Sequence, residues 1–250
     1  MLFAVMLAII IPSAYFYTSA SLPQLDTEFD LLRVLKQPIE SERRSKQMNR
    51  YDKNKAPVEF ARPDIATIPK ELVAFYITER GCPAYFQSPR EEGGAWAKRM
   101  FGSFMGMEFD GDGWCEKLFS DNLARRAGAK GSLEVAVASH KIHRFLKKDG
   151  LVAYDLLTTP AEDGIIGVED IAKELFHKKL EELTLAELAE LQLAVPPHGY
   201  YMQVKLCMNP NLLRQNRDIL LERLGLAGMT AMDKAEIAKQ APVACIAVKR

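Results

Sequence analysis

The sequence predicts an all-α protein, with one large helical domain at residues 57–250 behind a polar segment and an apolar N-terminus. Apolar side chains recur at helical spacing through most of this domain, and few stretches alternate as a strand would. Prolines and capping residues mark several helix starts. With 250 residues, 48% of them hydrophobic, the chain is long enough to bury a sizeable core.

The charged residues balance, with 33 Lys and Arg against 33 Asp and Glu. A general nucleic-acid binder would carry a basic stripe or patch, because the phosphate backbone supplies most of its affinity. We therefore expect no nucleic-acid partner.

The first 25 residues contain no charged side chain, and residues 2–17 are almost wholly apolar. A transmembrane helix needs roughly 20 apolar residues to cross about 30 Å of hydrocarbon, and the aromatic cluster Tyr15, Phe16 and Tyr17 favours the membrane interface. Residues 1–20 are therefore predicted to be a single-pass membrane anchor. The alternative is a cleaved signal peptide that ends at Ala20, although no basic region precedes the apolar run.

Residues 21–56 are polar and rich in charge, and residues 40–50 nearly lack apolar side chains. A segment of this composition buries too little apolar surface to offset the entropy of folding. We expect a polar stalk between the anchor and the folded domain.

The first clear helix of the domain is expected to begin at Ile68 to Leu72, with Pro69 in its first turn, where proline is favoured. Its apolar positions recur at helical spacing. They define a buried face made of Leu72, Val73, Phe75 and Tyr76.

Residues 167–197 are expected to form two helices joined by a tight elbow. The Thr184 hydroxyl can cap the second helix, while Glu187, three residues on, reaches back to complete a capping box. Pro196 and Pro197 end the second helix, because proline cannot donate to the helical ladder.

Residues 95–109 combine aromatic and methionine side chains with Gly102 and Gly106. Glycine lowers helix stability, and a flexible apolar segment beside Lys98 and Arg99 is typical of an interfacial membrane contact. Core packing is the alternative interpretation, and the sequence leaves both open.

The four cysteines are too dispersed for a zinc site, which needs paired ligands at short spacing. They are Cys82, Cys115, Cys207 and Cys245. Disulfides are allowed if the domain is extracytoplasmic, with three pairings open, but we favour four buried thiols. His140 and His143 lie three residues apart without a third metal ligand nearby, so we expect ordinary histidines on a helix face.

Several spaced residues carry a family resemblance. The pattern G-V-x-x-A-A-x-x-Y-F-G-K, followed by L-T-L-A-E-A-A-L-L-A-x-L-P, is matched in register by Gly167, Val168, Ala172, Phe176, Lys178 and the stretch from Leu183 to Leu188. Further on, Asn209-Pro210 and Arg217 fit N-P-x-x-A-x-x-R-R. In these residues the chain resembles the peptidoglycan glycosyltransferases (glycosyltransferase family 51), the transglycosylases of class A penicillin-binding proteins and monofunctional enzymes. The resemblance covers residues 57–243.

This resemblance implies a lysozyme-like, bilobed helical glycosyltransferase domain. Such a domain moves a growing glycan from its undecaprenyl pyrophosphate carrier to the 4-hydroxyl of the next lipid-linked disaccharide. It also implies single-pass attachment to the bacterial inner membrane, with the domain on the periplasmic or extracytoplasmic side. The implied partners are the lipid-linked peptidoglycan precursor, the membrane and other cell-wall synthesis proteins, and residues 95–109 fall where the family has its membrane-dipping jaw.

In the family's first motif, E-D-x-x-F-x-x-H-x-G, the glutamate is the general base on the acceptor hydroxyl. Glu79 falls at that position, and a general base there must reach the hydroxyl proton. Arg80 replaces the aspartate, which departs from the motif. The alternative is that Glu79 is a surface carboxylate at a helix end.

The second motif, G-x-S-T-I-T-Q-Q-L-x-K-N-L, is largely lost, although Asn122 is kept. Arg125, Arg126 and Lys130 lie close by in the sequence and could replace the missing charge on the pyrophosphate; a solvated basic face is the alternative. Glu134 matches the second carboxylate, in R-K-x-x-E, which in the family supports the pyrophosphate and a divalent metal.

Three hypotheses follow. The first is a membrane-anchored, monofunctional peptidoglycan glycosyltransferase-like protein with Glu79 and Glu134 as catalytic carboxylates, and with Asn122, Arg125, Arg126 and Lys130 as substrate contacts. The second is a non-catalytic relative that binds lipid-linked precursor, glycan or a wall-synthesis partner. The third is a membrane-anchored helical protein that binds no ligand.

Overall fold

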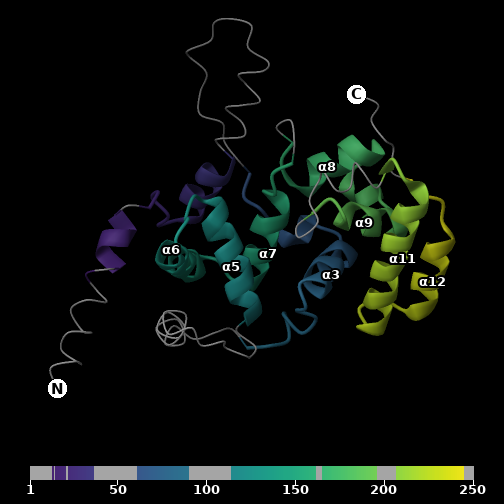
Figure 1. Cartoon of the computed structure of the whole chain (residues 1–250), viewed down its shortest axis with the longest axis horizontal. Helices are drawn as coiled ribbons and strands as arrows, with labels where there is room; N and C mark the ends of the chain where they lie inside the picture. Colours follow the sequence, from purple (N-terminus) through teal and green to yellow (C-terminus); the bar gives the residue numbers. More distant parts are fainter. Residues whose placement is uncertain are drawn as a thin grey trace, which may run out of the picture. The chain divides into compact units, whose positions relative to one another are not determined.

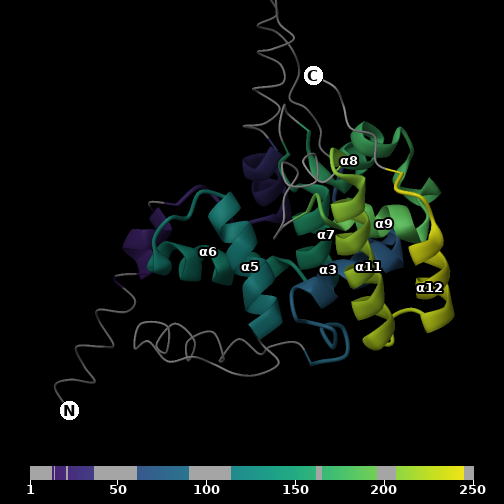
Figure 2. The ribbon, with the colours of Figure 1, turned by 45° about the vertical axis from the view of Figure 1, so that its right-hand side comes forward.

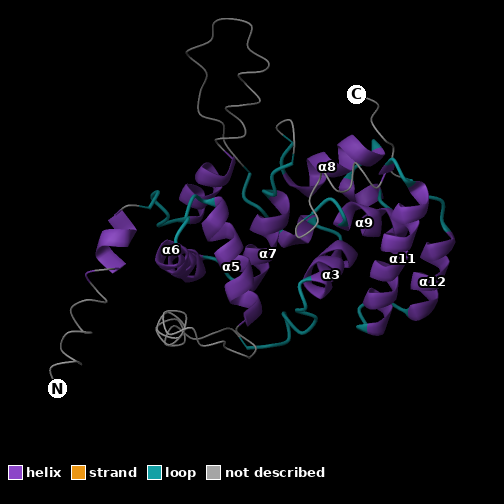
Figure 3. Cartoon of the chain, in the orientation of Figure 1, coloured by secondary structure: helices purple, strands orange, loops and turns teal. Residues whose placement is uncertain are grey.

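The computed structural model describes residues 13, 15–20, 22–36, 61–89, 114–161, 165–195 and 207–244. Helices are the regular elements within these ranges, where no strand forms and one isolated antiparallel bridge joins Pro160 to Ile166 (Figure 3). The all-α prediction is confirmed for this part of the chain.

The chain divides into two compact units, each built from two separate stretches of sequence. Unit 1 comprises Met1–Leu35 and Phe86–Leu151, and unit 2 comprises Lys36–Tyr85 and Val152–Arg250. The sequence alone had suggested one continuous body from residue 57 onward.

Unit 1 is built on α5 (Trp114–Arg126) and α6 (Ser132–Phe145), which pack against each other (Figures 1 and 2). Phe119, Leu123 and Ile142 are fully buried there. A buried hydrogen bond of 2.6 Å runs from Ser139 Oγ to Ser120 Oγ, so these two buried hydroxyls are paired. Helix α7 (Lys148–Leu157) begins in unit 1.

Residues 28–36 form a further helix, within the segment expected to be a polar stalk. Leu31, Leu32 and Leu35 are buried in it, at the spacing of a helix face. Thr27 and Asp30 form its capping box, since Asp30 N donates to Thr27 Oγ1 at 3.1 Å and Thr27 N donates to Asp30 Oδ2 at 3.1 Å. The described part of this segment is therefore folded rather than a solvated stalk.

Helix α9 (Leu185–Gln192) is the centre of unit 2, and its residues from Ala186 to Gln192 are buried. It packs against α3, α8, α11 and α12, and α11 also packs against α3 and α12. Their bounds are α3 Lys70–Glu79, α8 Gly167–Phe176, α11 Pro210–Leu226 and α12 Met232–Gln240. Two short 3₁₀ helices, η1 (Ile65–Thr67) and η3 (Leu180–Glu182), precede α3 and α9.

Helix α3 begins as the sequence predicts, because Pro69 is its N-cap and Lys70 its first residue. The expected face of Leu72, Val73, Phe75 and Tyr76 is buried, each side chain being at most 6% exposed. This prediction is confirmed.

The elbow between α8 and α9 is also confirmed. Glu187 N donates to Thr184 Oγ1 at 3.3 Å, and Thr184 N donates to Glu187 Oε2 at 2.8 Å, which completes the capping box. Helix α8 begins at Gly167 with φ +79°, and a Cβ there would lie 2.4 Å from the Leu157 carbonyl oxygen. Both the backbone conformation and the space at this position require glycine.

Within the described ranges, no helix is long and apolar enough to span a bilayer. Several features predicted from the sequence lie outside these ranges, and the structure does not test them. They are most of the expected anchor, residues 37–56 of the expected stalk, the apolar stretch 95–109, and Pro196-Pro197.

Candidate functional site

Glu79 is the last residue of α3 and belongs to unit 2. Its side chain is 5% exposed, and its Oε1 accepts a hydrogen bond from Arg223 Nη1 of α11 at 2.9 Å. The neighbouring Thr78 hydroxyl lies 3.0 Å from Met229 Sδ, just beyond α11. Glu79 is thus an oriented, largely buried carboxylate rather than a solvated one.

Arg80 directly follows Glu79 and folds back over its own helix. Its guanidinium lies 5.1 Å from the centroid of the Tyr76 ring, and its Nη2 donates to the Tyr76 hydroxyl at 3.3 Å. That hydroxyl in turn donates to Asp155 Oδ2 of α7. Asp155 is fully buried, so Tyr76 compensates for part of the cost of placing a carboxylate in the core.

The predicted substrate contacts gather in unit 1, around the end of α5 and the turn into α6. Asn122 and Arg126 are half-buried, whereas Arg125 and Lys130 are exposed. The two arginines occupy the last turn of α5, where a positive charge interacts favourably with the helix dipole. This contact stabilises the helix whether or not a ligand binds.

Glu134 lies in the first turn of α6 in unit 1 and serves as a capping carboxylate. Its Oε2 accepts hydrogen bonds from the backbone N–H groups of Lys130 at 2.7 Å and Gly131 at 3.2 Å. These two hydrogen bonds hold the pKa of the Glu134 carboxyl below its usual range, with a smaller contribution from the charge of Lys130. The carboxylate oxygen that caps the helix is therefore already engaged by the protein.

The residues around Glu134 do not fit the divalent metal that the family resemblance suggests. A magnesium-type ion takes its ligands from several carboxylate, carbonyl and water oxygens. In the described part of the chain, no group of three His, Cys, Asp or Glu side chains could hold a metal ion.

The structure thus places the six predicted residues in two groups. Asn122, Arg125, Arg126, Lys130 and Glu134 belong to unit 1, where the turn between α5 and α6 brings them into one neighbourhood. Glu79 belongs to unit 2, with Arg223 as its partner.

Unit 1 contains a buried charge cluster that the sequence does not reveal. Glu116 of α5 is 1% exposed, and its Oε2 lies 2.6 Å from His143 Nε2 of α6, while its Oε1 lies 3.4 Å from Lys148 Nζ. Lys148 Nζ also donates to the carbonyl oxygen and the hydroxyl of Ser88, at 2.6 and 2.9 Å. The sequence predicts that His143 lies on a helix face, but nothing in it identifies the partner 27 residues away.

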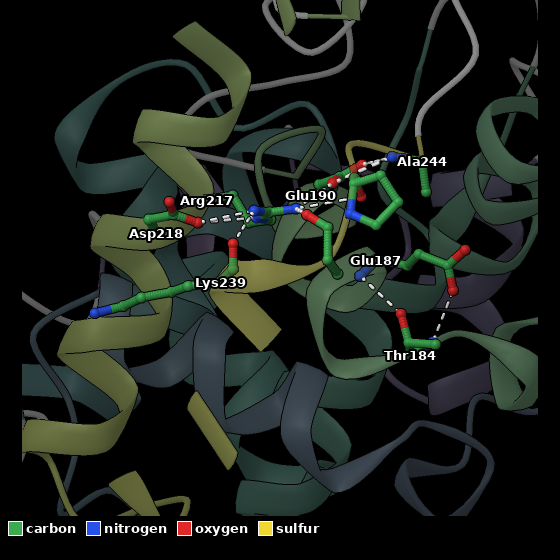
Figure 4. A network of polar contacts seen from close by, with 9 residues as sticks. Thr184, Glu187, Glu190, Arg217, Asp218, Lys239 and Ala244 are labelled. Carbon is green, nitrogen blue, oxygen red and sulfur yellow. Dashed lines mark hydrogen bonds and ion pairs between the residues drawn. The ribbon is translucent and has the colours of Figure 1, made fainter. Parts of the chain in front are cut away.

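A second buried network that the sequence did not reveal lies in unit 2 (Figure 4). Arg217 of α11 and Glu190 of α9 are both 0% exposed and are 3.3 Å apart. Arg217 also donates to the backbone carbonyls of Lys239 and Ala241, each at 2.9 Å, and Glu190 Oε2 accepts from Ala244 N at 3.2 Å. The pair therefore fixes the segment after α12 to the core.

Cys82, Cys115 and Cys207 are disulfide-bonded. No cysteine in the described ranges is free. The expectation of buried thiols is thus wrong for these three residues. Composition could not decide the matter, because a buried thiol and a buried disulfide leave the same apolar pattern in a sequence.

Comparisons of the chain with protein-family models and with curated proteins give no match.

Proposed function

We propose that the chain is a membrane-anchored, monofunctional peptidoglycan glycosyltransferase-like protein that polymerises glycan strands from lipid-linked disaccharide precursor. The observation that carries the proposal is the end of α3. The helix has the predicted start and buried face, and its last residue, Glu79, is a carboxylate held by Arg223 at 2.9 Å. The resemblance assigns the general base to this position, and a base must reach the proton that it accepts and have a suitable pKa. The contact with Arg223 fixes where the carboxylate lies, and the experiment below tests whether it acts as a base.

The proposal includes a lysozyme-like, bilobed fold and a location on the extracytoplasmic side of a bacterial inner membrane. The disulfide-bonded cysteines support this location, because disulfides persist in oxidising compartments and are rare in the cytosol. The confirmed Thr184 capping box and the buried Arg217 lie at positions that match the family patterns, and they support the fold.

A second candidate is a relative that binds the lipid-linked precursor without turning it over. Glu134 favours it, because Oε2 of this carboxylate caps α6 through two backbone amides, whereas the resemblance would require the carboxylate to serve the pyrophosphate. The loss of most of the second motif points the same way.

The deciding experiment uses the purified full-length chain in detergent, with fluorescently labelled lipid-linked disaccharide pentapeptide. Polymer is followed by gel electrophoresis and binding by fluorescence anisotropy, for wild type, Glu79→Gln and Glu71→Gln. The last variant is a matched control, because Glu71 lies on the same helix α3 in its first turn. We expect wild type and Glu71→Gln to make polymer and Glu79→Gln to lose it.

Binding without polymer in all three proteins would support the second candidate in place of the first. If wild type neither binds the precursor nor makes polymer, both candidates are contradicted, and the chain is a helical protein that does not use this ligand.

A further inference from the structure

Helix α11 carries apolar side chains on two opposite faces. The face that packs against α3, α9 and α12 is buried, and Leu220 and Leu224 are among its side chains. The other face presents Leu212, Ile219 and Leu226, which are 44%, 48% and 73% exposed. These three residues are spaced seven apart, so each lies only about 20° around the helix from the one before it. We call this row the α11 stripe.

The α11 stripe differs from the scattered apolar residues of an ordinary protein surface. Single exposed hydrophobic residues need no explanation, whereas a contiguous apolar patch marks an interaction site. From residue 212 to residue 226 the stripe extends about 21 Å, at about 1.5 Å per residue. A row of this length and narrow width fits the side of another helix, since apolar residues at a seven-residue repeat form helix–helix seams.

The polar residues beside the α11 stripe indicate which partner it fits. Helix geometry places Gln215 and Glu222 along one edge of the stripe, and Asn216 and Arg223 along the other. A helix that lies on a bilayer has Lys and Arg beside its apolar face, where they meet anionic headgroups. Here one carboxylate balances one guanidinium, so the edges favour a protein partner over an anionic membrane surface.

The edges are complementary to those of a second copy of the same helix. When the two copies run in opposite directions with Ile219 at the centre, each edge meets the same edge of the other copy. Gln215 then lies beside the partner's Glu222, and Asn216 beside the partner's Arg223, each offset by about 1.5 Å along the axis. The glutamine amide can donate to the carboxylate, and the asparagine oxygen can accept from the guanidinium.

A pair that runs in the same direction is complementary as well. Opposite edges then meet, and Glu222 lies beside the partner's Arg223 with the same small offset. Arg223 Nη1 already donates to Glu79, but a guanidinium has five N–H donors, so both contacts can form. In either direction Ile219 lies opposite the partner's Ile219, and no like charges lie side by side.

We propose that the α11 stripe is a two-fold interface with a second copy of this chain, with Ile219 of each copy at the symmetry axis. In such an interface one patch serves both subunits. One helix against one helix buries less than the about 1,200–2,000 Å² of a stable complex, so the dimer is weak and forms at about 10–100 µM. The interface belongs to unit 2 and does not depend on glycosyl transfer.

The test measures self-association of the purified full-length chain by sedimentation equilibrium in density-matched detergent, from about 1 to 500 µM. We expect a concentration-dependent dimer in wild type. Ile219→Glu should weaken it on the order of 100-fold, because two carboxylates then meet at the centre. Leu133→Glu is the matched control, since Leu133 is 39% exposed in the first turn of α6, where an acidic residue is tolerated, and it should associate as wild type.

A mixing experiment tests whether the stripe meets its own copy. Ile219→Glu and Ile219→Lys should each associate poorly alone, because like charges face each other. An equimolar mixture of the two should recover to within about 10-fold of wild type, since opposite charges then meet at the same place. This recovery requires that residue 219 of one copy lies next to residue 219 of the other.

Three results would overturn the proposal. The first is a wild type that stays monomeric over the whole range, including one whose binding to anionic lipid vesicles depends on Ile219, which would make the stripe a membrane contact. The second is association that neither Ile219→Glu nor Leu226→Ser weakens; Leu226→Ser is a small change at a residue that is 73% exposed, and it decides if Ile219→Glu does not fold. The third is a mixture of folded Ile219→Glu and Ile219→Lys that associates no better than either variant alone.

Discussion

Replacement of Arg217 by methionine should destabilise unit 2 more than most single substitutions do. The variant keeps the apolar stem and removes the guanidinium, which is 0% exposed. It also removes the guanidinium from the Glu190 carboxylate, which is itself 0% exposed. Removal of one partner of a buried ion pair costs about 3–5 kcal/mol, mainly because the other charge stays buried.

The loss extends beyond the ion pair. The guanidinium also donates to the carbonyl oxygens of Lys239, in the last turn of α12, and of Ala241, just after it, so the end of α12 loses both contacts (Figure 4). This segment is partly exposed, and water can replace those hydrogen bonds at little net cost. We therefore keep the estimate at about 3–5 kcal/mol and expect the largest rise in amide exchange in residues 239–244.

The assay must report on unit 2 alone. Both tryptophans of the chain, Trp96 and Trp114, belong to unit 1, so tryptophan fluorescence does not follow unit 2. Urea unfolding should therefore be followed by amide exchange of peptides from α9 and α11, in wild type, Arg217→Met and Arg214→Met. Arg214 is exposed on the same helix, and its substitution should change the free energy of unfolding by less than about 0.5 kcal/mol.

A double variant tests whether the loss of stability comes from the unpaired charge of Glu190. Arg217→Met together with Glu190→Leu removes both charges, and replacement of a whole buried ion pair by apolar residues is often neutral or stabilising relative to the intact pair. We expect the double variant to be more stable than Arg217→Met alone. Two results would contradict this role of the buried pair. One is a loss of less than about 1 kcal/mol in the free energy of unfolding for Arg217→Met; the other is a double variant whose loss equals the sum of the losses of its two single variants.

Three further predictions concern local features. Gly167→Ala should lower the free energy of unfolding in urea by about 2–5 kcal/mol, because it adds left-handed backbone strain and places a Cβ 2.4 Å from a carbonyl oxygen. Gly228 also has a positive φ but lies in open space, so Gly228→Ala should lower the free energy of unfolding by the backbone strain alone. Thr184→Ala should cost about 0.5–2 kcal/mol by loss of the α9 cap, which exchange of the Glu187 amide would reveal. Glu134→Gln should lower the melting temperature near pH 7, and the difference from wild type should disappear in acid. The pKa of the Glu134 carboxyl is lowered in the folded protein, so the stability that the ionised carboxylate contributes is lost as the pH falls through that pKa. A difference in melting temperature that does not change with pH would contradict this.

The sequence predicts those parts of the fold that depend on local rules. The buried face of α3 follows from apolar spacing, and the start of α9 follows from a threonine and a glutamate three residues apart. The helix at 28–36 obeys the same rules, with Thr27 and Asp30 as its cap, but the surrounding charge concealed it. Composition averaged over residues 21–56 hid three leucines that one helical turn brings together.

The buried polar pairs could not be predicted, because the partners are far apart in the sequence. Glu116 and His143 are 27 residues apart, and so are Glu190 and Arg217. A charged residue on a helix has no sequence feature that tells a buried ion pair from a solvated face. A charged residue is almost never buried unless it is paired, so a charged position in a helix is predicted to be exposed when its partner is not known.

The end of α3 shows why a match in register does not by itself transfer a chemical role. The resembling motif has an aspartate after its glutamate, whereas this chain has Arg80, whose long side chain folds back onto Tyr76, four residues earlier. An aspartate is too short and has the wrong charge for that contact. With Arg223 at 2.9 Å, Glu79 has guanidinium groups as neighbours where the family pattern places a second carboxylate. A positive environment favours anionic groups of a substrate. If the chain binds the proposed lipid-linked pyrophosphate through these arginines, added salt should weaken that binding, and the same affinity in low and high salt would contradict this role for them.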